Sequence, residues 1–569
     1  MKSSLLLSLI LLLTTVVFAQ NRYDVVIDEI MADPSPSIGL PGNEWVELKN
    51  TSSLPINLQG WRIGDSNGQS GPIPNFLLQP DSIVIICTGS AVAAMSTFGN
   101  TISVTSFPSL DNDGEEVVLK SSDGTIIHAV SYKAGWYQNE LKKQGGWTLE
   151  MIDPHNPCSG ISNWKASINT QGGTPGTINS VDAVNNDQQS PELINAFVKD
   201  NSTIILSFNE PIDSLSGISL ANYGMDGGLA LSSAEVLSPS FYQVMLKTIN
   251  PIEQDKVYVA TVNSITDCKG NTISVKNTAK FGLPVDAIAG DIIVNEILFN
   301  PRSTGYDYVE LYNKSNKIVD AAKLYVSNRN NSGGINSITQ LSISPFYLFP
   351  GDYIVITEDA DNLALNYLVQ NPDAVLGVSS LPSFPDDEGF VVVLNQQGEV
   401  IDEVNYSADW HFKLIDNAEG ISLERVDADG ASQYADNWHS AASTAGFGTP
   451  GYKNSQFKNQ QAISATIQVT PKVFSPDNDG FDDIASIHYK ISEPGYVANI
   501  TIFDAAGRPV RNLVRNGTMA ITGYWNWDGL NDKGLKLPIG TYILFTEIFN
   551  LRGKKERFKN TVVLVRKLN

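Results

Sequence analysis

The chain has 569 residues, and its 61 Asp and Glu against 38 Lys and Arg give a formal net charge of −23 at pH 7. This excess of acid disfavours binding to nucleic acid or to anionic membrane surfaces, because both need Lys and Arg to neutralise phosphate groups. It is compatible with cations, Ca²⁺ above all, and with solubility outside the cell. The length predicts roughly four domains.

Residues 1–19 predict an export signal. Lys2 provides a positive start, residues 5–17 form an apolar core, and Val17-Phe18-Ala19 is a small-x-small cleavage motif. No later apolar run approaches the ~20 residues that a membrane-spanning helix needs. We therefore expect an exported protein, secreted or held on the outer cell surface, with no transmembrane segment.

The chain has three cysteines, which are too few for a framework of disulfides. Cys87 lies in an apolar run and is expected to be a buried small hydrophobe. Cys158 and Cys268 are compatible with a bridge, but their spacing in the sequence does not establish one.

One stretch of the sequence occurs twice, at residues 147–176 and 421–451. The matching segments keep a nearly constant offset and are Leu149-Glu150 with Leu423-Glu424, Asn163-Trp164 with Asn437-Trp438, and Thr174-Pro175-Gly176 with Thr449-Pro450-Gly451. A constant offset indicates a duplicated module. Each copy is predicted to be a strand, a polar loop, a Trp anchor and a Gly/Pro exit that closes a β-domain.

Residues 21–180 contain many short apolar runs separated by turns rich in Gly, Asn and Asp, which is typical of a β-sandwich. Asp123-Gly124 is a hairpin signal between two of these runs. Residues 91–98 are the best candidate for a helix. Residues 291–455 repeat the same order of predicted strands, so we expect two copies of one sandwich.

Both copies resemble the bacterial lamin-tail domain, and the resemblance implies an immunoglobulin-like sandwich in secreted or cell-surface multidomain proteins. The residues that carry it are Asp28-Glu29-Ile30, Glu44–Leu48, Asn50 and Gly60-Trp61 in the first copy, and Asn295-Glu296-Ile297, Asp307–Leu311 and Asn313 in the second. The second copy departs from the pattern at one position, where Leu324 replaces Trp61.

Residues 188–285 are similar to bacterial Ig-like spacer domains. The similarity rests on Asn209-Glu210-Pro211-Ile212-Asp213 and on Asp267-Cys268-Lys269-Gly270-Asn271. It implies a rigid spacer without catalysis.

Residues 464–569 resemble the flagellar-hook-cap type of Ig-like domain at the C-termini of exported Bacteroidetes proteins. Trp525-Asn526-Trp527-Asp528-Gly529 and Gly540-Thr541-Tyr542 carry this resemblance. It implies export or anchoring through cell-envelope machinery, a role that the basic residues between 552 and 567 would suit.

The most metal-like run is the loop from residue 477 to 483. Its carboxylates could surround Ca²⁺ because Gly480 lets the loop turn back, and they are Asp477, Asp479, Asp482 and Asp483. The bidentate Glu of a full EF-hand loop is missing, and an Asx-turn entering a strand is the alternative. The run at residues 111–116 is similar but is expected to be a solvated hairpin turn.

Tryptophans offer a second kind of candidate site, since their rings can stack on sugars. Trp61 and Trp136 are the candidate ligand contacts, with packing in the core as the alternative that we favour. Trp61 has no counterpart in the second copy, whereas Trp136 recurs as Trp410.

Paired carboxylates could hydrolyse a glycoside if they faced a cleft at a fixed separation. The candidates are Glu29 and Glu47 with their repeats Glu296 and Glu310. They alternate with apolar residues, so a solvent-facing or backbone-bonding role is the default. The five histidines show no metal-ligand spacing.

We expect an all-β chain of four tandem immunoglobulin-like β-sandwiches behind the export signal. The predicted function is non-enzymatic, either structural and adhesive or ligand-binding, with an extracellular protein or polysaccharide as partner. The alternatives are a polysaccharide-binding accessory of a secreted hydrolase system and a hydrolase with a carboxylate site.

Overall fold

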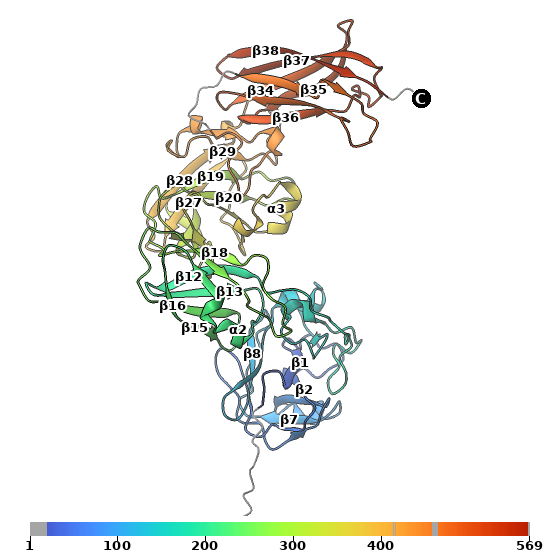
Figure 1. Cartoon of the computed structure of the whole chain (residues 1–569), viewed down its shortest axis with the longest axis vertical. Helices are drawn as coiled ribbons and strands as arrows, with labels where there is room; N and C mark the ends of the chain where they lie inside the picture. Colours follow the sequence, from blue (N-terminus) through green and yellow to red (C-terminus); the bar gives the residue numbers. More distant parts are fainter. Residues whose placement is uncertain (1–19, 414, 416, 458–464, 567–569) are drawn as a thin grey trace, which may run out of the picture. The chain divides into compact units, whose positions relative to one another are not determined.

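The computed structural model describes residues 20–413, 415, 417–457 and 465–566 (Figure 1). The predicted export signal at residues 1–19 lies outside this range. So does most of the segment at residues 456–461, whose polar sequence predicts a linker before the last module. Strands make up 39% of the chain and helices 8%, so the prediction of an all-β chain of tandem sandwiches is confirmed. In the part that the structure describes, no helix is long and apolar enough to cross a membrane.

The chain divides into two compact units. Among the described residues, the first unit holds 20–253 and 258–281, and the second holds 254–257 and those from 282 to 566. Each unit contains two packed β-modules.

The first module of the first unit has a large sheet, a small sheet and a two-stranded ribbon. The large sheet has the order β11-β10-β1-β2-β6-β7, with β1 (Val25–Met31), β2 (Trp45–Asn50), β6 (Ile83–Thr88), β7 (Thr101–Val104), β10 (Leu149–Met151) and β11 (Trp164–Ala166). The small sheet contains β4 (Arg62–Gly64), β8 (Glu116–Lys120) and β9 (Ile126–Ser131). The ribbon pairs β3 (Ile56–Asn57) with β5 (Leu77–Leu78). The helix predicted at residues 91–98 is present but shorter, as α1 (Val92–Met95).

Strand β1 is buried along its whole length because both of its faces are covered. Its apolar residues, such as Ile27 and Ile30, enter the core between the sheets. A bulge between Ile27 and Glu29 breaks the alternation of the strand. The side chain of Glu29 instead meets the segment that closes the module, where Thr174 lies.

The spacer module completes the first unit. Its four-stranded sheet contains β12 (Leu193–Asp200), β13 (Thr203–Phe208), β16 (Gln243–Thr248) and β15 (Leu231–Leu237), and its three-stranded sheet contains β14 (Tyr223–Met225), β17 (Tyr258–Val262) and β18 (Thr278–Phe281). A short α-helix, α2 (Ser214–Gly217), lies between β13 and β14.

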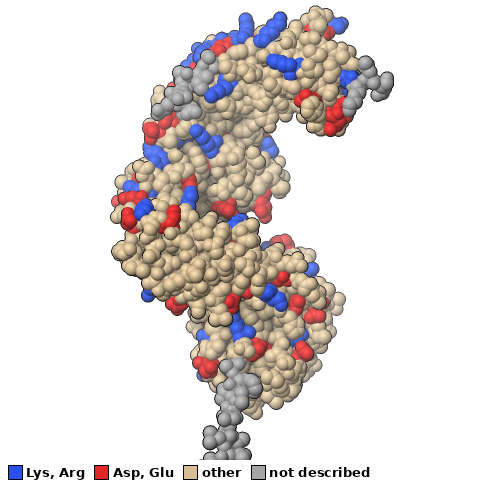
Figure 2. Space-filling view, in the orientation of Figure 1, with Lys and Arg blue, Asp and Glu red and all other residues tan. Residues whose placement is uncertain are grey.

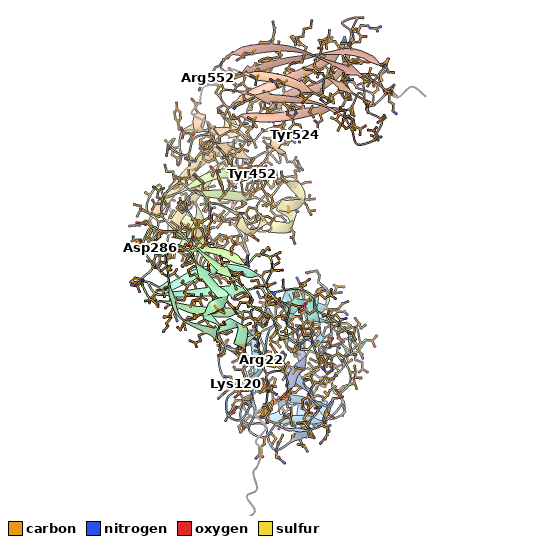
Figure 3. The ribbon with its side chains drawn as sticks, viewed as in Figure 1. Arg22, Lys120, Asp286, Tyr452, Tyr524 and Arg552 are labelled. Atoms are coloured by element: carbon orange, nitrogen blue, oxygen red, sulfur yellow. A yellow bond between two sulfur atoms is a disulfide. The ribbon has the colours of Figure 1, made fainter. Side chains whose placement is uncertain are left out.

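Several contacts join the spacer to the first module, among them a disulfide and a cation–π contact. Cys158 and Cys268 form a disulfide, so the bridge that the sequence left open is present. The guanidinium of Arg22, which Figure 3 labels, lies 3.7 Å from the ring centroid of Phe241. Cys87 is a free, buried thiol as expected.

The first module of the second unit repeats the topology of the first copy. Its large sheet has the order β26-β25-β20-β19-β29-β30, with β19 (Ile292–Leu298), β20 (Tyr308–Asn313), β25 (Tyr353–Thr357), β26 (Val375–Gly377), β29 (Leu423–Arg425) and β30 (Trp438–Ser440). A second, four-stranded sheet contains β22 (Leu324–Arg329), β23 (Ile335–Gln340), β27 (Glu388–Asn395) and β28 (Val400–Ser407). The ribbon pairs β21 (Val319–Asp320) with β24 (Tyr347–Leu348), and the module also contains the helix α3 (Ala360–Asn366).

The last module is a sandwich of three and five strands around its own core. The three-stranded sheet contains β31 (Thr466–Thr470), β33 (Ala485–Lys490) and β36 (Thr522–Trp527). The five-stranded sheet contains β32 (Val473–Phe474), β38 (Lys555–Leu564), β37 (Gly540–Asn550), β34 (Tyr496–Phe503) and β35 (Pro509–Thr518). Lys and Arg side chains gather over this module on the face shown in Figure 2. Its final hairpin contributes exposed cations at Lys554, Lys555, Arg557 and Lys559.

Candidate functional site

Three glutamates lie side by side in the large sheet of the first module. Glu29 on β1 is opposite Glu47 on β2 and Glu150 on β10, and all three are fully buried. They hold the closing loop: the Thr174 N–H donates to Glu29 Oε1 at 2.8 Å, and the Gly176 N–H donates to Glu47 Oε2 at 2.6 Å. The hydroxyl of Thr174 donates to Glu150 Oε1 at 2.9 Å.

The second copy repeats this arrangement residue by residue. Glu296 on β19 is opposite Glu310 on β20 and Glu424 on β29. The Thr449 N–H donates to Glu296 Oε1 at 2.9 Å, and the Gly451 N–H donates to Glu310 Oε2 at 2.7 Å. The Thr449 hydroxyl donates to Glu424 Oε1 at 3.0 Å. The recurring Leu-Glu and Thr-Pro-Gly segments of the sequence are therefore partners in one closure.

Burial dominates the electrostatics of these clusters. It raises the pKa of Glu29, Glu47 and Glu310 well above the ordinary glutamate value, and it raises the pKa of Glu424 to about 8. The solvent-facing role expected as one default is therefore wrong, because the closing loop covers the carboxylates. The backbone-bonding role is the one found, and a glycosidic bond has no access to any of the six glutamates in this conformation.

The two tryptophans predicted as ligand contacts lie in the core. Trp61 is 1% exposed and packs among the buried apolar residues of the first module. Trp136 is 8% exposed, and its ring centroid lies 6.2 Å from that of Trp164. Their burial leaves neither ring a free face for a sugar, so the structure matches the core-packing alternative for both residues.

The acidic loop brings three of its four predicted ligands together. Carboxylate oxygens of Asp477, Asp479 and Asp483 lie within 4.8 Å of one another, and Asp482 is not part of this group. The Asp483 carboxylate accepts backbone N–H groups of Asp477 at 3.1 Å, Asn478 at 2.6 Å and Gly480 at 2.8 Å. The Phe481 N–H donates to Asp479 Oδ1 at 3.0 Å, which is the bond of an Asx-turn. These backbone bonds hold the loop without a cation, and Ca²⁺ binding here stays a prediction.

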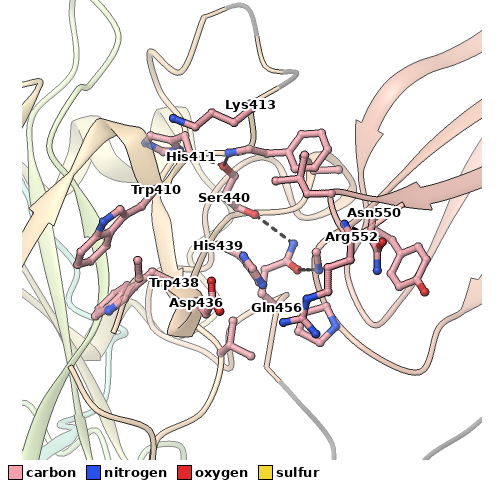
Figure 4. A pocket seen from close by; sticks show the side chains of 18 of the residues that line it. Trp410, His411, Lys413, Asp436, Trp438, His439, Ser440, Gln456, Asn550 and Arg552 are labelled. Atoms are coloured by element: carbon pink, nitrogen blue, oxygen red, sulfur yellow. Dashed lines mark hydrogen bonds between the residues drawn. The ribbon is translucent and has the colours of Figure 1, made fainter. Parts of the chain in front are cut away.

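A cavity of about 390 Å³ lies within the second unit, between the closing strand β30 of its first module and the last module (Figure 4). Figure 4 shows Trp410 and Trp438 on one side and Arg552 and Asn550 on the other. The centroids of the two indoles lie 6.3 Å apart, and Trp410 is only half-buried.

The histidines of this cavity are uncharged at neutral pH. Burial lowers the pKa of His411 to about 4, and it also lowers the pKa of His439. His411 Nδ1 lies 3.0 Å from the Ser440 hydroxyl, which accepts the Phe412 N–H at 2.9 Å. A catalytic serine needs a base that a third group orients. His411 Nε2 has no hydrogen-bond partner among the described residues, so the pair lacks that third group there.

Comparison with known families accounts for the duplication. The family model described as Lamin Tail Domain matches residues 19–134 and 286–408. The chain carries two lamin tail domains. In each copy the match ends before the third glutamate and the closing loop, although both belong to the same packed module as the matched strands.

No curated protein matches the chain. Among solved structures, the chain is similar to a DUF4876 family protein from Bacteroides thetaiotaomicron, with 13% identity over 42% of this chain and 97% of that one, and a TM-score of 0.20. It is also similar to the N-terminal part of the bacterial S-layer protein SbsC, with 16% identity over 29% of this chain and a TM-score of 0.16. The alignment spans only 40% of that SbsC chain. A third similar structure is the Ca²⁺-stabilised, ice-binding adhesin of an Antarctic bacterium, with 10% identity over 96% of this chain and all of that one, and a TM-score of 0.12. TM-scores this low carry no inference about function.

Several residues that hold the lamin tail domains closed were missed by the sequence reasoning. Asn179 in the first domain and Asn454 in the second each donate to two carbonyl groups, and both stand three residues after a Thr-Pro-Gly segment. His128 and Arg425 are buried and bind backbone groups of the opening strands. The asparagines could have been found by extending the repeat comparison a few residues further.

Proposed function

We propose that this protein is a non-enzymatic structural or adhesive protein that acts outside the cell, secreted or on the outer cell surface. The observation that carries this proposal is the use of the buried glutamates. Groups such as Glu29 and Glu296, which would be the natural acids or bases of a hydrolase, are sealed under the closing loops as hydrogen-bond acceptors. The interior chemistry of each lamin tail domain therefore serves closure.

Two further features support a place outside the cell. A disulfide between Cys158 and Cys268 is typical of oxidising compartments. The net charge of −23 supports solubility and disfavours nucleic acid as a partner. An extracellular protein or polysaccharide is the partner that this combination favours.

The last module is proposed to connect the protein to cell-envelope export or anchoring machinery. The exposed cations of its final hairpin contrast with the acidic balance of the whole chain. The test is display of the protein on cells of a host that exports it, measured by protease access to intact cells. Removal of residues 464–569 is expected to abolish display, and normal display of the shortened chain would refute this role.

The absence of catalysis has its own test. The purified protein is incubated with a panel of polysaccharides and phosphate esters, beside the Glu47→Gln and Glu310→Gln variants. We expect no turnover by any of them. Turnover by the native protein that is lost in either variant would overturn the proposal and favour a hydrolase with a carboxylate site.

Polysaccharide binding at the cavity of the second unit is a second candidate function. The observation that favours it is a half-buried indole, Trp410, in a cavity that exposed Lys413 and Arg552 also line. Trp410→Ala is expected to lower retention on insoluble polysaccharides at least tenfold. Trp136→Ala is the matched control, because the equivalent indole of the first lamin tail domain is buried, and equal loss in both variants would refute the site.

A further inference from the structure

A second group of acids, away from the sites described above, lies in the first unit where the lamin tail domain meets the spacer. Oxygens of Asp187, Glu210 and Asp267 lie within 4.8 Å of one another. Glu210 is 7% exposed and Asp267 is 2% exposed, while Asp187 is half-buried. These residues come from three separate segments, so the fold brings them together.

The three segments belong to both modules of the first unit. Asp187 belongs to the segment that leaves the closed lamin tail domain, and Glu210 follows β13 of the spacer. Asp267 directly precedes Cys268, whose disulfide to Cys158 ties its loop to the lamin tail domain. The carboxylates are therefore fixed at a joint between two modules.

Glu210 is the member that lacks a partner. Its Oε1 atom is buried and has no hydrogen bond, although the side chain is more than nine-tenths buried. Burial first, and then the charges of Asp267, Asp187 and Glu192, raise its pKa to about 8. Every charged group that shifts this carboxyl is itself an acid, so nothing described around it neutralises the charge.

The other two carboxylates are oriented by hydrogen-bond donors that contact them directly. Asp187 Oδ2 accepts the Ser159 hydroxyl at 2.7 Å, and Asp187 Oδ1 accepts the Gln189 N–H at 2.9 Å. Asp267 Oδ2 accepts the side-chain amide of Asn271 at 2.7 Å. A carboxylate oxygen has two lone pairs, so each of these atoms retains capacity for one more partner.

We propose that Asp187, Glu210 and Asp267 bind one Ca²⁺ ion at the joint between the first lamin tail domain and the spacer. Ca²⁺ takes oxygen ligands at about 2.3–2.6 Å, so two of its ligands lie no more than about 5 Å apart. The spacing of these three carboxylates meets that requirement. The ligand set contains only oxygen, which favours a hard cation such as Ca²⁺ over zinc or copper. Bound there, the ion stiffens a joint that the disulfide already ties.

The test is calorimetric titration of Ca²⁺ into the full chain at pH 7.5, after treatment with a chelator. Wild type is expected to bind Ca²⁺ at this site, and Glu210→Gln is expected to weaken that binding by at least tenfold. The control variant Asp479→Asn/Asp483→Asn removes acids of the loop in the last module. It should leave Ca²⁺ binding at the joint unchanged. Unaltered binding by Glu210→Gln, or no binding by wild type, would overturn the proposal.

A second measurement separates loss of a ligand from loss of the fold. Hydrogen exchange of residues 258–281 should slow at least fivefold on addition of Ca²⁺ in wild type and not in Glu210→Gln. Without Ca²⁺, Glu210→Gln should be protected at least as well as wild type, because the substitution replaces a buried ionisable group among other acids with a neutral amide. Asp187→Asn, at a half-buried position, should also weaken Ca²⁺ binding, and Ca²⁺-dependent protection that persists in both variants would refute the site.

Discussion

In the second lamin tail domain, both oxygens of Glu296 and of Glu310 accept hydrogen bonds, whereas in the first domain Glu29 Oε2 and Glu47 Oε1 are buried without a partner. The closing loops are held by the same backbone contacts in both. The difference therefore lies in the side chains around the glutamates and not in the fold.

The Oε2 atom of Glu296 accepts the Thr449 hydroxyl at 2.7 Å, whereas the Thr174 hydroxyl of the first domain donates to Glu150 and not to Glu29 Oε2. Two exchanges of residues add to this difference: one gives Glu296 Oε1 a further donor, and the other gives Glu310 Oε1 the partner that Glu47 Oε1 lacks. Tyr308 donates its hydroxyl to Glu296 at 2.5 Å, while the first domain has Trp45 at that place, and the Trp45 indole N–H is buried and unpaired. Asn295 donates its amide to Glu310 Oε1 at 2.7 Å, while the first domain has Asp28, which cannot donate when ionised. A duplicated closure can thus keep its geometry while the two copies differ in how completely their polar interior is satisfied.

The opening strands differ in the same way. In the first domain the Ile27 N–H donates to Nδ1 of His128 at 2.8 Å. In the second domain the Val294 N–H donates to Asp402 at 2.8 Å, and buried Arg425 pairs with that carboxylate at 3.1 Å. The backbone N–H of the opening strand is therefore bound by a neutral imidazole ring in the first domain and by the carboxylate of a buried ion pair in the second.

The largest expected effect comes from breaking that ion pair. Arg425→Met leaves the largely buried carboxylate of Asp402 without its cation, which is expected to cost the second domain about 3–5 kcal/mol. The measurement is the free energy of local opening from hydrogen exchange in β19 and β29, with β1 and β10 of the first domain as an internal reference.

The double variant Arg425→Met/Asp402→His is the control for this prediction, because it imitates the first domain. It is expected to recover at least half of the lost protection. A loss below about 1 kcal/mol in the single variant would mean that the pair contributes no more than a surface salt bridge.

Exchange of Trp61 for Leu is expected to have the next largest effect. Trp61 fills the core of the first domain where the second domain has Leu324, and both are 1% exposed. Trp61→Leu should destabilise the first domain by roughly 2–3 kcal/mol, less than the ~3–5 kcal/mol of a truncation to Ala, because part of the volume is kept. Hydrogen exchange in β4 and β8 measures it, and an unchanged domain would mean that the ring is not part of the core.

The duplication, the all-β class and the hairpin at residues 123–124 were predictable because each depends on local pattern or on repeated spacing. The closures at Glu150 and Glu424 were visible as repeated Leu-Glu segments. The burial of the glutamates was not predictable. Strand alternation assigns Glu29 to one face of a sheet, but it does not say what covers that face. Here the cover is Thr174, which lies far along the chain.

The cluster of Asp187, Glu210 and Asp267 was hidden from the sequence for a related reason. Its members lie in three segments whose meeting depends on how the spacer packs on the lamin tail domain. The loop at residues 477–483, by contrast, was visible as a local run, and three of its four acids do converge. Local motifs are therefore easier to find than sites assembled from distant segments.

A matched pair of glutamate variants tests the comparison between the two closures directly. Glu296 accepts four hydrogen bonds and Glu29 accepts two, so the loss should follow the number of donors. Glu296→Gln should cost about 2 kcal/mol and Glu29→Gln about 1 kcal/mol, measured by exchange in β19 and β1. Equal losses in the two domains would show that only the shared contact to the closing loop matters.

The smallest expected effect is also the one that depends on pH. Burial raises the pKa of Asp28 to about 7 from an ordinary value of 3.8. Because the folded state binds this proton more tightly, the stability linked to Asp28 is fully present below about pH 4 and is lost as the pH rises through 7. Asp28→Asn supplies a permanent donor of the kind that Asn295 provides in the second domain. It should stabilise the first domain by about 1 kcal/mol at pH 8 and by much less at pH 4.

Asn295→Asp is the reciprocal exchange, and it should destabilise the second domain at pH 8 and not at pH 4. Hydrogen exchange in β1 and β19 at both pH values, corrected for the pH dependence of intrinsic exchange, measures the two variants side by side. The charge of Asp28 contributes to the raised pKa of Glu29 and of Glu47, so Asp28→Asn removes that contribution together with the acid itself. A gain for Asp28→Asn that is the same at both pH values would show that the substitution acts through packing, and the unpaired acid would then not explain the difference between the two domains.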